Sequence, residues 1–222
     1  MRPPVRALGA STAALLVGVL LAGCADGGWD RARPAPAAVG SLGAGFRPLA
    51  SPAPESTVHP PDGSWGDLAP GRGYRVALVR AGTTREVRTM VAAVRRWAAR
   101  TGVDLRVVDA DRVPDPVDAL VEAMDLRPDL VMSAGDALVD PLALVTANHL
   151  DRHFLVLGAE VAEPTANVTA VDWTGASFRG EGLGTPSAYD PTSFTAERCD
   201  RAVRAGTAAV LTGMTGVVVA VD

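Results

Sequence analysis

Short apolar runs alternate with amphipathic stretches from residue 74 to the end of the sequence. Six runs have the length and composition of buried strands: 75–79, 105–108, 129–133, 153–157, 168–171 and 217–221. The first four strands start near residues 75, 104, 129 and 153, which leaves room for one helix between successive strands. This spacing predicts right-handed βαβ units with parallel strands. We therefore expect a doubly wound α/β fold with a mainly parallel sheet.

Helix signals occupy the intervals between these strands. Thr83 and Glu86 have the spacing of a capping box, and the amphipathic stretch that follows ends at Gly102. Asp115 and Pro116 are an N-cap and a first-turn proline for a second helix, which ends before residue 128. Two further helices are expected over 138–150, with Asp136 or Asp140 as the cap, and over 196–211, with Cys199 facing inward.

The first 23 residues have the pattern of an export signal. Arg2 and Arg6 precede an uncharged stretch of apolar and small residues over 7–22, which is too short to span a bilayer comfortably. The stretch ends in Leu-Ala-Gly-Cys at 21–24 and resembles a bacterial lipobox, in which the Cys24 thiol receives a diacylglyceryl group. The alternative is a plain signal peptide whose junction contains a cysteine. The lipobox interpretation predicts an exported lipoprotein, anchored on the extracytoplasmic face of the cell membrane.

The segment over 24–73 has the composition of a linker. Residues 25–73 contain 8 Pro and 9 Gly, and no apolar period of a strand or helix runs through them. Such a composition predicts a flexible tether before a folded domain at 74–222. Trp29, Phe46 and Trp65 are the exceptions, because each could pack onto the domain.

Composition narrows the classes of function. The formal net charge is −4, all 21 basic residues are Arg, and no basic cluster marks a nucleic-acid surface. The two cysteines and three histidines lack the spacing of a metal site. Neither a dinucleotide fingerprint nor a phosphate loop follows the first strand, and no serine lies in a nucleophile elbow. We therefore predict no cofactor, no metal, no nucleic-acid partner and no enzyme activity.

Polar residues follow the carboxyl ends of the predicted strands, where α/β proteins bind ligands. The candidate ligand-binding residues are Thr83, Thr84, Arg85, Ser133, Asp136, Glu160, Asp172 and Trp173. Asp136 is either a helix cap or a ligand contact. Glu160 and Asp172 are either a carboxylate pair or residues of solvated turns and hydroxyl acceptors. Trp173 either stacks on a sugar or base or covers the end of the core.

Three stretches resemble the basic membrane lipoprotein family, whose members are type 1 periplasmic-binding-protein-like receptors. The stretches are 127–138, with Pro-Asp-Leu-Val, 154–158, and 167–171, with Asn-Val-Thr-Ala-Val. The resemblance covers residues 74–222 and implies the substrate-binding component of an ABC transporter, with a nucleoside or other small polar solute as ligand. It also implies a membrane permease as partner. Because the family binds its ligand between two lobes, we expect only the first lobe here, with a partner protein as a candidate second lobe.

The sequence leaves two functions open. The first is a solute-binding lipoprotein, which predicts saturable binding of a small molecule. The alternative is a structural or interaction lipoprotein, a relict receptor lobe that contacts another envelope protein and binds no solute. Saturable binding distinguishes the two.

Overall fold

One parallel sheet organises the protein. The computed structural model describes residues 28, 29, 31–176 and 188–221. Within them, seven strands pair in the order β1-β7-β6-β5-β4-β2-β3, and every neighbouring pair is parallel. The strands are β1 Thr57–Val58, β2 Arg75–Arg80, β3 Asp104–Asp109, β4 Leu130–Ala134, β5 Phe154–Leu157, β6 Val168–Asp172 and β7 Val218–Ala220. The predicted α/β class with a parallel sheet is confirmed.

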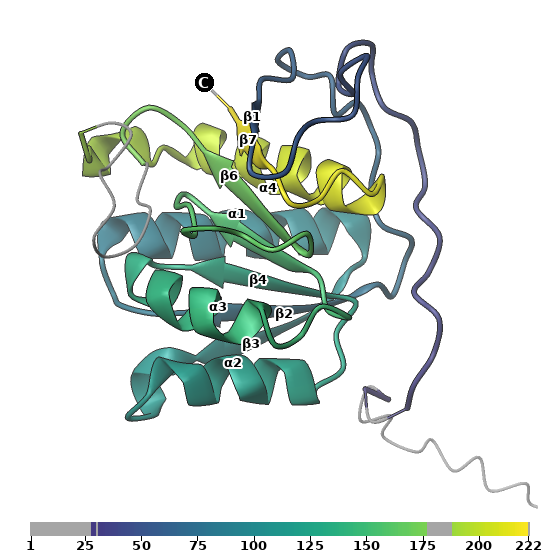
Figure 1. Cartoon of the computed structure of the whole chain (residues 1–222). Coiled ribbons are helices and arrows are strands. Elements are labelled where there is room, and N and C mark those ends of the chain that lie inside the picture. Colours follow the sequence, from purple (N-terminus) through teal and green to yellow (C-terminus); the bar gives the residue numbers. More distant parts are fainter. Residues whose placement is uncertain (1–27, 30, 177–187, 222) are drawn as a thin grey trace, which may run out of the picture.

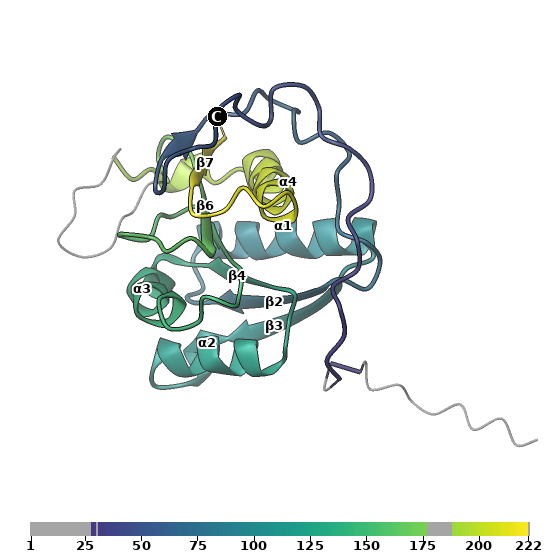
Figure 2. The same cartoon turned by 45° about the vertical axis from the view of Figure 1, so that its right-hand side comes forward.

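In the described residues, four α-helices cover the two faces of this sheet. Helices α1 (Arg85–Thr101) and α4 (Ala196–Leu211) pack on one face, and α2 (Pro116–Asp125) and α3 (Val139–Thr146) pack on the other (Figure 1). Turning the molecule separates the two layers clearly (Figure 2). Because side chains alternate along a strand, β2 contributes Leu78 to the first core and Val79 to the second. The central strands β2, β4, β5 and β6 are therefore buried on both faces, which explains their apolar runs.

Two helix boundaries differ from the predictions. The N-cap of α1 is Thr84, not Thr83, because the Thr84 hydroxyl accepts a hydrogen bond from the amide of Val87. Helix α3 ends at 146 instead of 150, and neither predicted aspartate caps it, since the chain enters through a 3₁₀ turn over 136–138. The Asn167 side-chain amide donates to the carbonyls of Thr146 and His149. It thereby satisfies backbone acceptors where the helix stops.

The described part of the segment predicted as a flexible tether packs along the domain instead. Phe46 and Trp65 are 1% and 3% exposed and belong to the core beneath α1 and α4. Strand β1 pairs with β7 at the edge of the sheet. In Figure 1 this segment runs along one side of the sheet and over its top. Single aromatic insertions and a two-residue strand require no hydrophobic period, which is why the sequence pattern did not reveal them.

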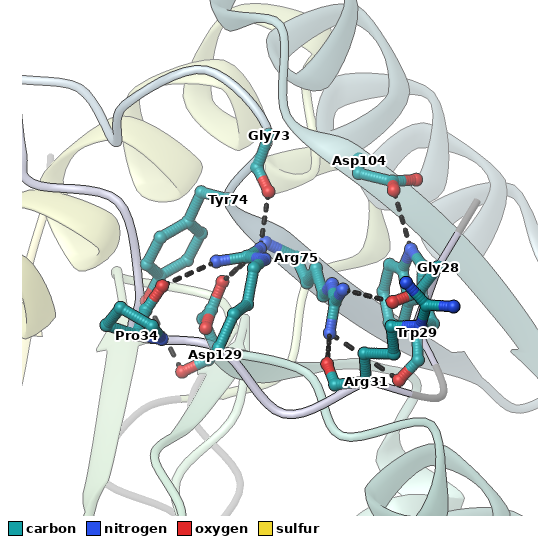
Figure 3. Close-up of polar contacts among 10 residues, drawn as sticks. Gly28, Trp29, Arg31, Pro34, Gly73, Tyr74, Arg75, Asp104 and Asp129 are labelled. Atoms are coloured by element: carbon teal, nitrogen blue, oxygen red, sulfur yellow. Dashed lines mark hydrogen bonds and ion pairs between the residues drawn. The ribbon is translucent and has the colours of Figure 1, made fainter.

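The start of this segment is fastened across the amino ends of β2, β3 and β4, a surface that we call the basal edge (Figure 3). Trp29 is 3% exposed, and its indole Nε1 donates to Asp104 at 2.6 Å. The buried Arg75 guanidinium donates to the carbonyls of Gly28 and Arg31. A second fastening joins Arg33 to Asp129 at 3.0 Å.

Two further observations concern the membrane predictions. None of the helices in the described residues is long and apolar enough to cross a membrane. The predicted signal at 1–23 and the predicted lipidation site, Cys24, lie outside the described residues.

Candidate functional site

The order of the strands creates a crevice between β2 and β4. From β2 the chain crosses to β3 on one side, and the next crossover returns to β4 on the other side. The loops after β2 and β4 therefore separate, and such a switch point is where open α/β sheets bind ligands. A cavity of about 180 Å³ lies there, and we call it the switch-point pocket. Its polar and aromatic lining comes from Thr84, Glu86, Asp136, Tyr189 and Phe194.

Larger hollows lie elsewhere among the described residues, and the two largest of them border α1. A hollow of about 520 Å³ lies between residues 62–65 and helices α1 and α4. A second hollow, of about 450 Å³, lies along the outer side of α1. Both are bounded mainly by exposed helix surface. The switch-point pocket is smaller, but strand ends and a helix N-terminus build it. We therefore take it as the candidate site.

A charged network shapes the loop at one wall of the pocket. The Arg80 guanidinium, at the end of β2, binds Asp111 at 2.9 Å and also binds Asp109. The amide of Gly82 donates to the Asp111 carboxylate at 2.8 Å. Gly82 has a φ of 84°, a conformation that glycine adopts readily. The network fixes the loop that places Thr84 at the N-terminus of α1.

Two carboxylates face the pocket, and their surroundings shift their pKa values in opposite directions. A hydrogen bond from the Thr84 hydroxyl lowers the pKa of Glu86. Burial raises the pKa of Asp136 above its ordinary value, and the neighbouring Glu86 carboxylate raises it further. Arg85 and Arg88 compensate part of the charge of Glu86, and the two carboxylates of the pocket accept hydrogen bonds and attract cations. Among the described residues, no group of three or more His, Cys, Asp or Glu side chains is placed to hold a metal ion.

Aromatic side chains form the opposite wall. The Tyr189 and Phe194 rings lie 6.0 Å apart between centroids, and the Phe194 ring meets Trp173 edge-on at 5.0 Å. The Trp173 indole donates to the Ser193 hydroxyl at 2.9 Å. Burial raises the pKa of Tyr189, with further contributions from Asp136 and Glu86, so its phenol stays protonated. The wall thus offers two ring surfaces and a hydroxyl group.

The structure brings two of the sequence-predicted site residues together. Thr84 and Asp136 share the switch-point pocket. Thr83 lines the neighbouring hollow along α1, and Arg85 is exposed at the start of that helix. These four residues surround one loop region.

The other predicted site residues lie elsewhere. Ser133 is 3% exposed within β4, and Asp172 is 6% exposed at the end of β6. Glu160 is buried and lines a separate hollow with Glu55. Trp173 is 2% exposed and packs behind Phe194, so its ring supports the pocket wall from the core side. Glu160 and Asp172 therefore do not form a carboxylate pair within the switch-point pocket.

Sequence reasoning missed three of the five polar and aromatic residues that line the pocket. Glu86 was interpreted only as part of a capping box, although the first turn of a helix after a strand also faces the ligand edge. Tyr189 and Phe194 follow no apolar period and lie more than fifty residues after β4. They reach the pocket through backbone contacts, including a 2.8 Å hydrogen bond from the Asp190 amide to the Gly175 carbonyl. No pattern in the neighbouring sequence predicts this contact.

Comparison with known proteins gives only distant structural matches. No protein-family model matches the chain, and no curated protein matches it. A solute-binding protein of an ABC transporter system from Aeropyrum pernix K1 matches with 16% identity and a TM-score of 0.39, covering 46% of this chain and 29% of that one. A 5-methylthioribose transporter solute-binding protein from Thermotoga lettingae TMO matches with 21% identity and a TM-score of 0.37, covering 45% and 32%.

A third match is a fragment named as a lipoprotein from Peptoclostridium difficile 630. It has 17% identity and a TM-score of 0.41, and the alignment covers 64% of this chain and 98% of that one. Solute-binding proteins of ABC transporters thus predominate among the similar structures, and the chain spans about a third of the length of the first ones. At these scores the likeness says nothing about ligand or partner.

Proposed function

We propose that the protein is an exported lipoprotein, anchored through Cys24, that binds a small polar solute in the switch-point pocket. It acts as a binding protein without catalytic activity and serves as the substrate-binding component of an ABC transporter. The observation that carries the proposal is the pocket itself, which combines two carboxylates with an aromatic wall at the switch point. The sequence-derived lipobox supports the anchor.

The chemistry of the pocket favours one class of ligand group. Glu86 and Asp136 accept hydrogen bonds, and Tyr189 and Phe194 offer ring faces. An ammonium group gains from both, since carboxylates and aromatic faces each attract cations. Ribose hydroxyls are the second choice, because they donate to carboxylates without carrying charge. A nucleoside would therefore bind through its sugar hydroxyls.

The small volume of the pocket favours the alternative function. Ligand pockets usually enclose about 300–1,000 Å³, whereas this one encloses about 180 Å³. It has room for the head of one amine or guanidinium group and leaves the rest of the molecule outside. A lysine or arginine side chain of another envelope protein would place only its charged head in the pocket. Such a contact agrees with the hypothesis of an interaction lipoprotein.

Thermal unfolding with added compounds distinguishes the two functions. We expect millimolar amines, nucleosides or sugars to raise the melting temperature, because a ligand at 100 times its Kd adds about 2.7 kcal/mol of stability. A shift caused by one compound class supports the solute-binding lipoprotein. Unchanged melting with all three classes contradicts it and supports the interaction lipoprotein.

Removing either pocket charge is expected to weaken binding of the compound found in that screen. Glu86→Gln and Asp136→Asn should each raise Kd roughly tenfold or more, since a hydrogen bond to a charged group contributes about 1.5–3 kcal/mol. Glu122→Gln is the matched control, because it removes an exposed carboxylate on α2, distant from the pocket. Titration calorimetry measures all three. Equal affinities in the pocket variants and the control would place the site elsewhere.

Acid should weaken the binding of a cationic solute as the pH falls through the pKa of Asp136, which lies above the ordinary value for an aspartate. The ionised form of Asp136 attracts the cation, and burial with the nearby Glu86 raises its pKa. As pH falls through that raised pKa, Asp136 becomes neutral and Kd rises. The Tyr189 phenol is protonated throughout, because its pKa is raised, and adds no pH dependence in this range. A Kd profile that is unchanged by Asp136→Asn would contradict this assignment.

A further inference from the structure

The fastening of Trp29 restricts how an anchored domain can stand on a membrane. Trp29 is the fifth residue after Cys24. Five extended residues reach about 17 Å at most. Trp29 is buried at the basal edge, so this edge lies within that distance of a lipid attached to Cys24. The connection is short instead of the long tether that the composition suggested.

Several specific contacts hold Trp29 and the neighbouring backbone on the domain. The Arg106 and Arg75 guanidinium groups lie 4.7 and 5.7 Å from the centre of the Trp29 ring. Arg75 is 7% exposed and binds backbone carbonyls of the segment before β1, while Asp104 accepts the indole N–H. A buried guanidinium that loses these carbonyls is strongly disfavoured. The attachment is therefore expected to hold while the domain is folded.

The charge of the basal edge suits a membrane surface. Arg31, Arg72 and Arg127 are exposed there. Of the nearby acids, Asp104 accepts the Trp29 indole N–H, Asp129 is paired with Arg33, and Asp125 is exposed at the end of α2. The edge is thus basic in a protein whose net charge is −4. Arginines near an anionic leaflet are attracted to it within a Debye length.

We propose that the basal edge docks on an anionic lipid surface, with the switch-point pocket facing away from the membrane. This inference rests on the proposed anchor at Cys24. The pocket lies at the opposite ends of the same strands, about 20 Å away along the six residues of β2. The anchor, the fastening and the basic edge all act at one end of the sheet, and together they define a single orientation.

Chemical coupling tests the orientation without depending on lipidation in the cell. The chain from Cys24 onward is coupled to a maleimide lipid in vesicles of phosphatidylcholine with phosphatidylglycerol. Cys199 does not compete, because it is 1% exposed and burial raises the pKa of its thiol to about 12. The sequence contains no lysine, so Arg72→Lys and Arg112→Lys each introduce a unique ε-amine, at the basal edge and beyond the end of β3.

The readout is acylation of that lysine by a membrane-impermeant reagent, measured by mass spectrometry. We expect coupling to slow acylation several-fold in Arg72→Lys and to leave Arg112→Lys unchanged. Inserting a long Gly-Ser segment after Asp26 lengthens the connection without altering any described contact, and in neutral vesicles it should abolish the protection. Equal protection at both positions, or protection that survives the insertion in neutral vesicles, overturns the proposal.

A second experiment tests the charge of the basal edge without any anchor. Cys24→Ser removes the attachment point, and sedimentation with anionic vesicles measures the remaining affinity. We expect Arg31→Gln with Arg72→Gln to lower partitioning many-fold, at roughly fivefold per arginine. The matched control is Arg85→Gln with Arg112→Gln, which removes equal charge at the pocket end. Equal loss in both double variants overturns a specific basal contact.

Labelling of Cys24 with palmitate in the native host separately tests the lipid anchor.

Discussion

The Phe46→Ala variant is expected to unfold with a free energy about 3–5 kcal/mol below that of the parent protein. Phe46 is 1% exposed and belongs to the core beneath α1 and α4, so its removal leaves a cavity among buried side chains. A phenylalanine in a free linker would have no such effect. The variant therefore measures directly whether residues 31–73 are part of the folded domain.

Leu49→Ala is the matched control for this prediction. Leu49 lies three residues further along the same segment and is fully exposed, so its truncation should change stability by at most about 0.5 kcal/mol. Urea unfolding, followed by circular dichroism, gives both values. If both variants lose the same small free energy of unfolding, the segment does not contribute to the core. The prediction of a flexible tether would then be correct.

The sheet and its helices could be predicted because their signals are local. Strand β2 has a continuous apolar run over 76–79, as expected for a strand buried on both faces. Helix α4 has the limits expected over 196–211, since its apolar stripe is long, and in the structure the Thr195 hydroxyl caps it. Asp115 and Pro116 likewise marked the start of α2 correctly. Each of these elements is specified by residues within one or two turns.

Parts of the site depend on contacts between distant segments and were not predictable in the same way. The strand ends pointed to Thr84 and Asp136, since the carboxyl edge of a parallel sheet is a general ligand position. Tyr189 and Phe194 join them only because the chain folds back from β6. Trp173 follows the end of β6, where stacking on a ligand was one of the two expected roles. In the structure its indole donates a hydrogen bond to Ser193 and the ring is buried. A tryptophan at a strand end can either stack on a ligand or cover the end of the core, and tertiary contacts determine which of the two it does.

The proposed orientation bears on the choice between the two functions. A receptor that hands its solute to a permease in the same membrane must bring its ligand edge to that membrane. With the basal edge docked, the switch-point pocket opens on the opposite side, and the short connection to Cys24 limits rotation. Delivery to a permease would then require the basal edge to leave the lipid surface and the domain to turn about its connection to Cys24. A pocket that faces outward suits a partner that approaches from outside the membrane.

The Gly135→Ala variant is expected to lose both stability and pocket function. Gly135 has a φ of 124°, which L-residues rarely adopt, and a Cβ there would overlap the carbonyl oxygen of Ala81. The two backbones that would collide are the loops after β2 and β4, so neither can move without opening the switch-point pocket. Backbone strain and the clash together should cost about 4 kcal/mol.

Gly63→Ala separates the steric effect from the effect of a positive φ alone. Gly63 has a φ of 73°, and a Cβ added there would meet no atom within 4 Å, so we expect a loss of only about 1–2 kcal/mol. Thermal unfolding compares the two variants, and calorimetry with the identified ligand measures binding. Gly135→Ala should also lose affinity, because Gly135 sets the position of Asp136 at the pocket. Similar stabilities in both variants, with binding intact, would show that the close approach of these loops is not needed for the site.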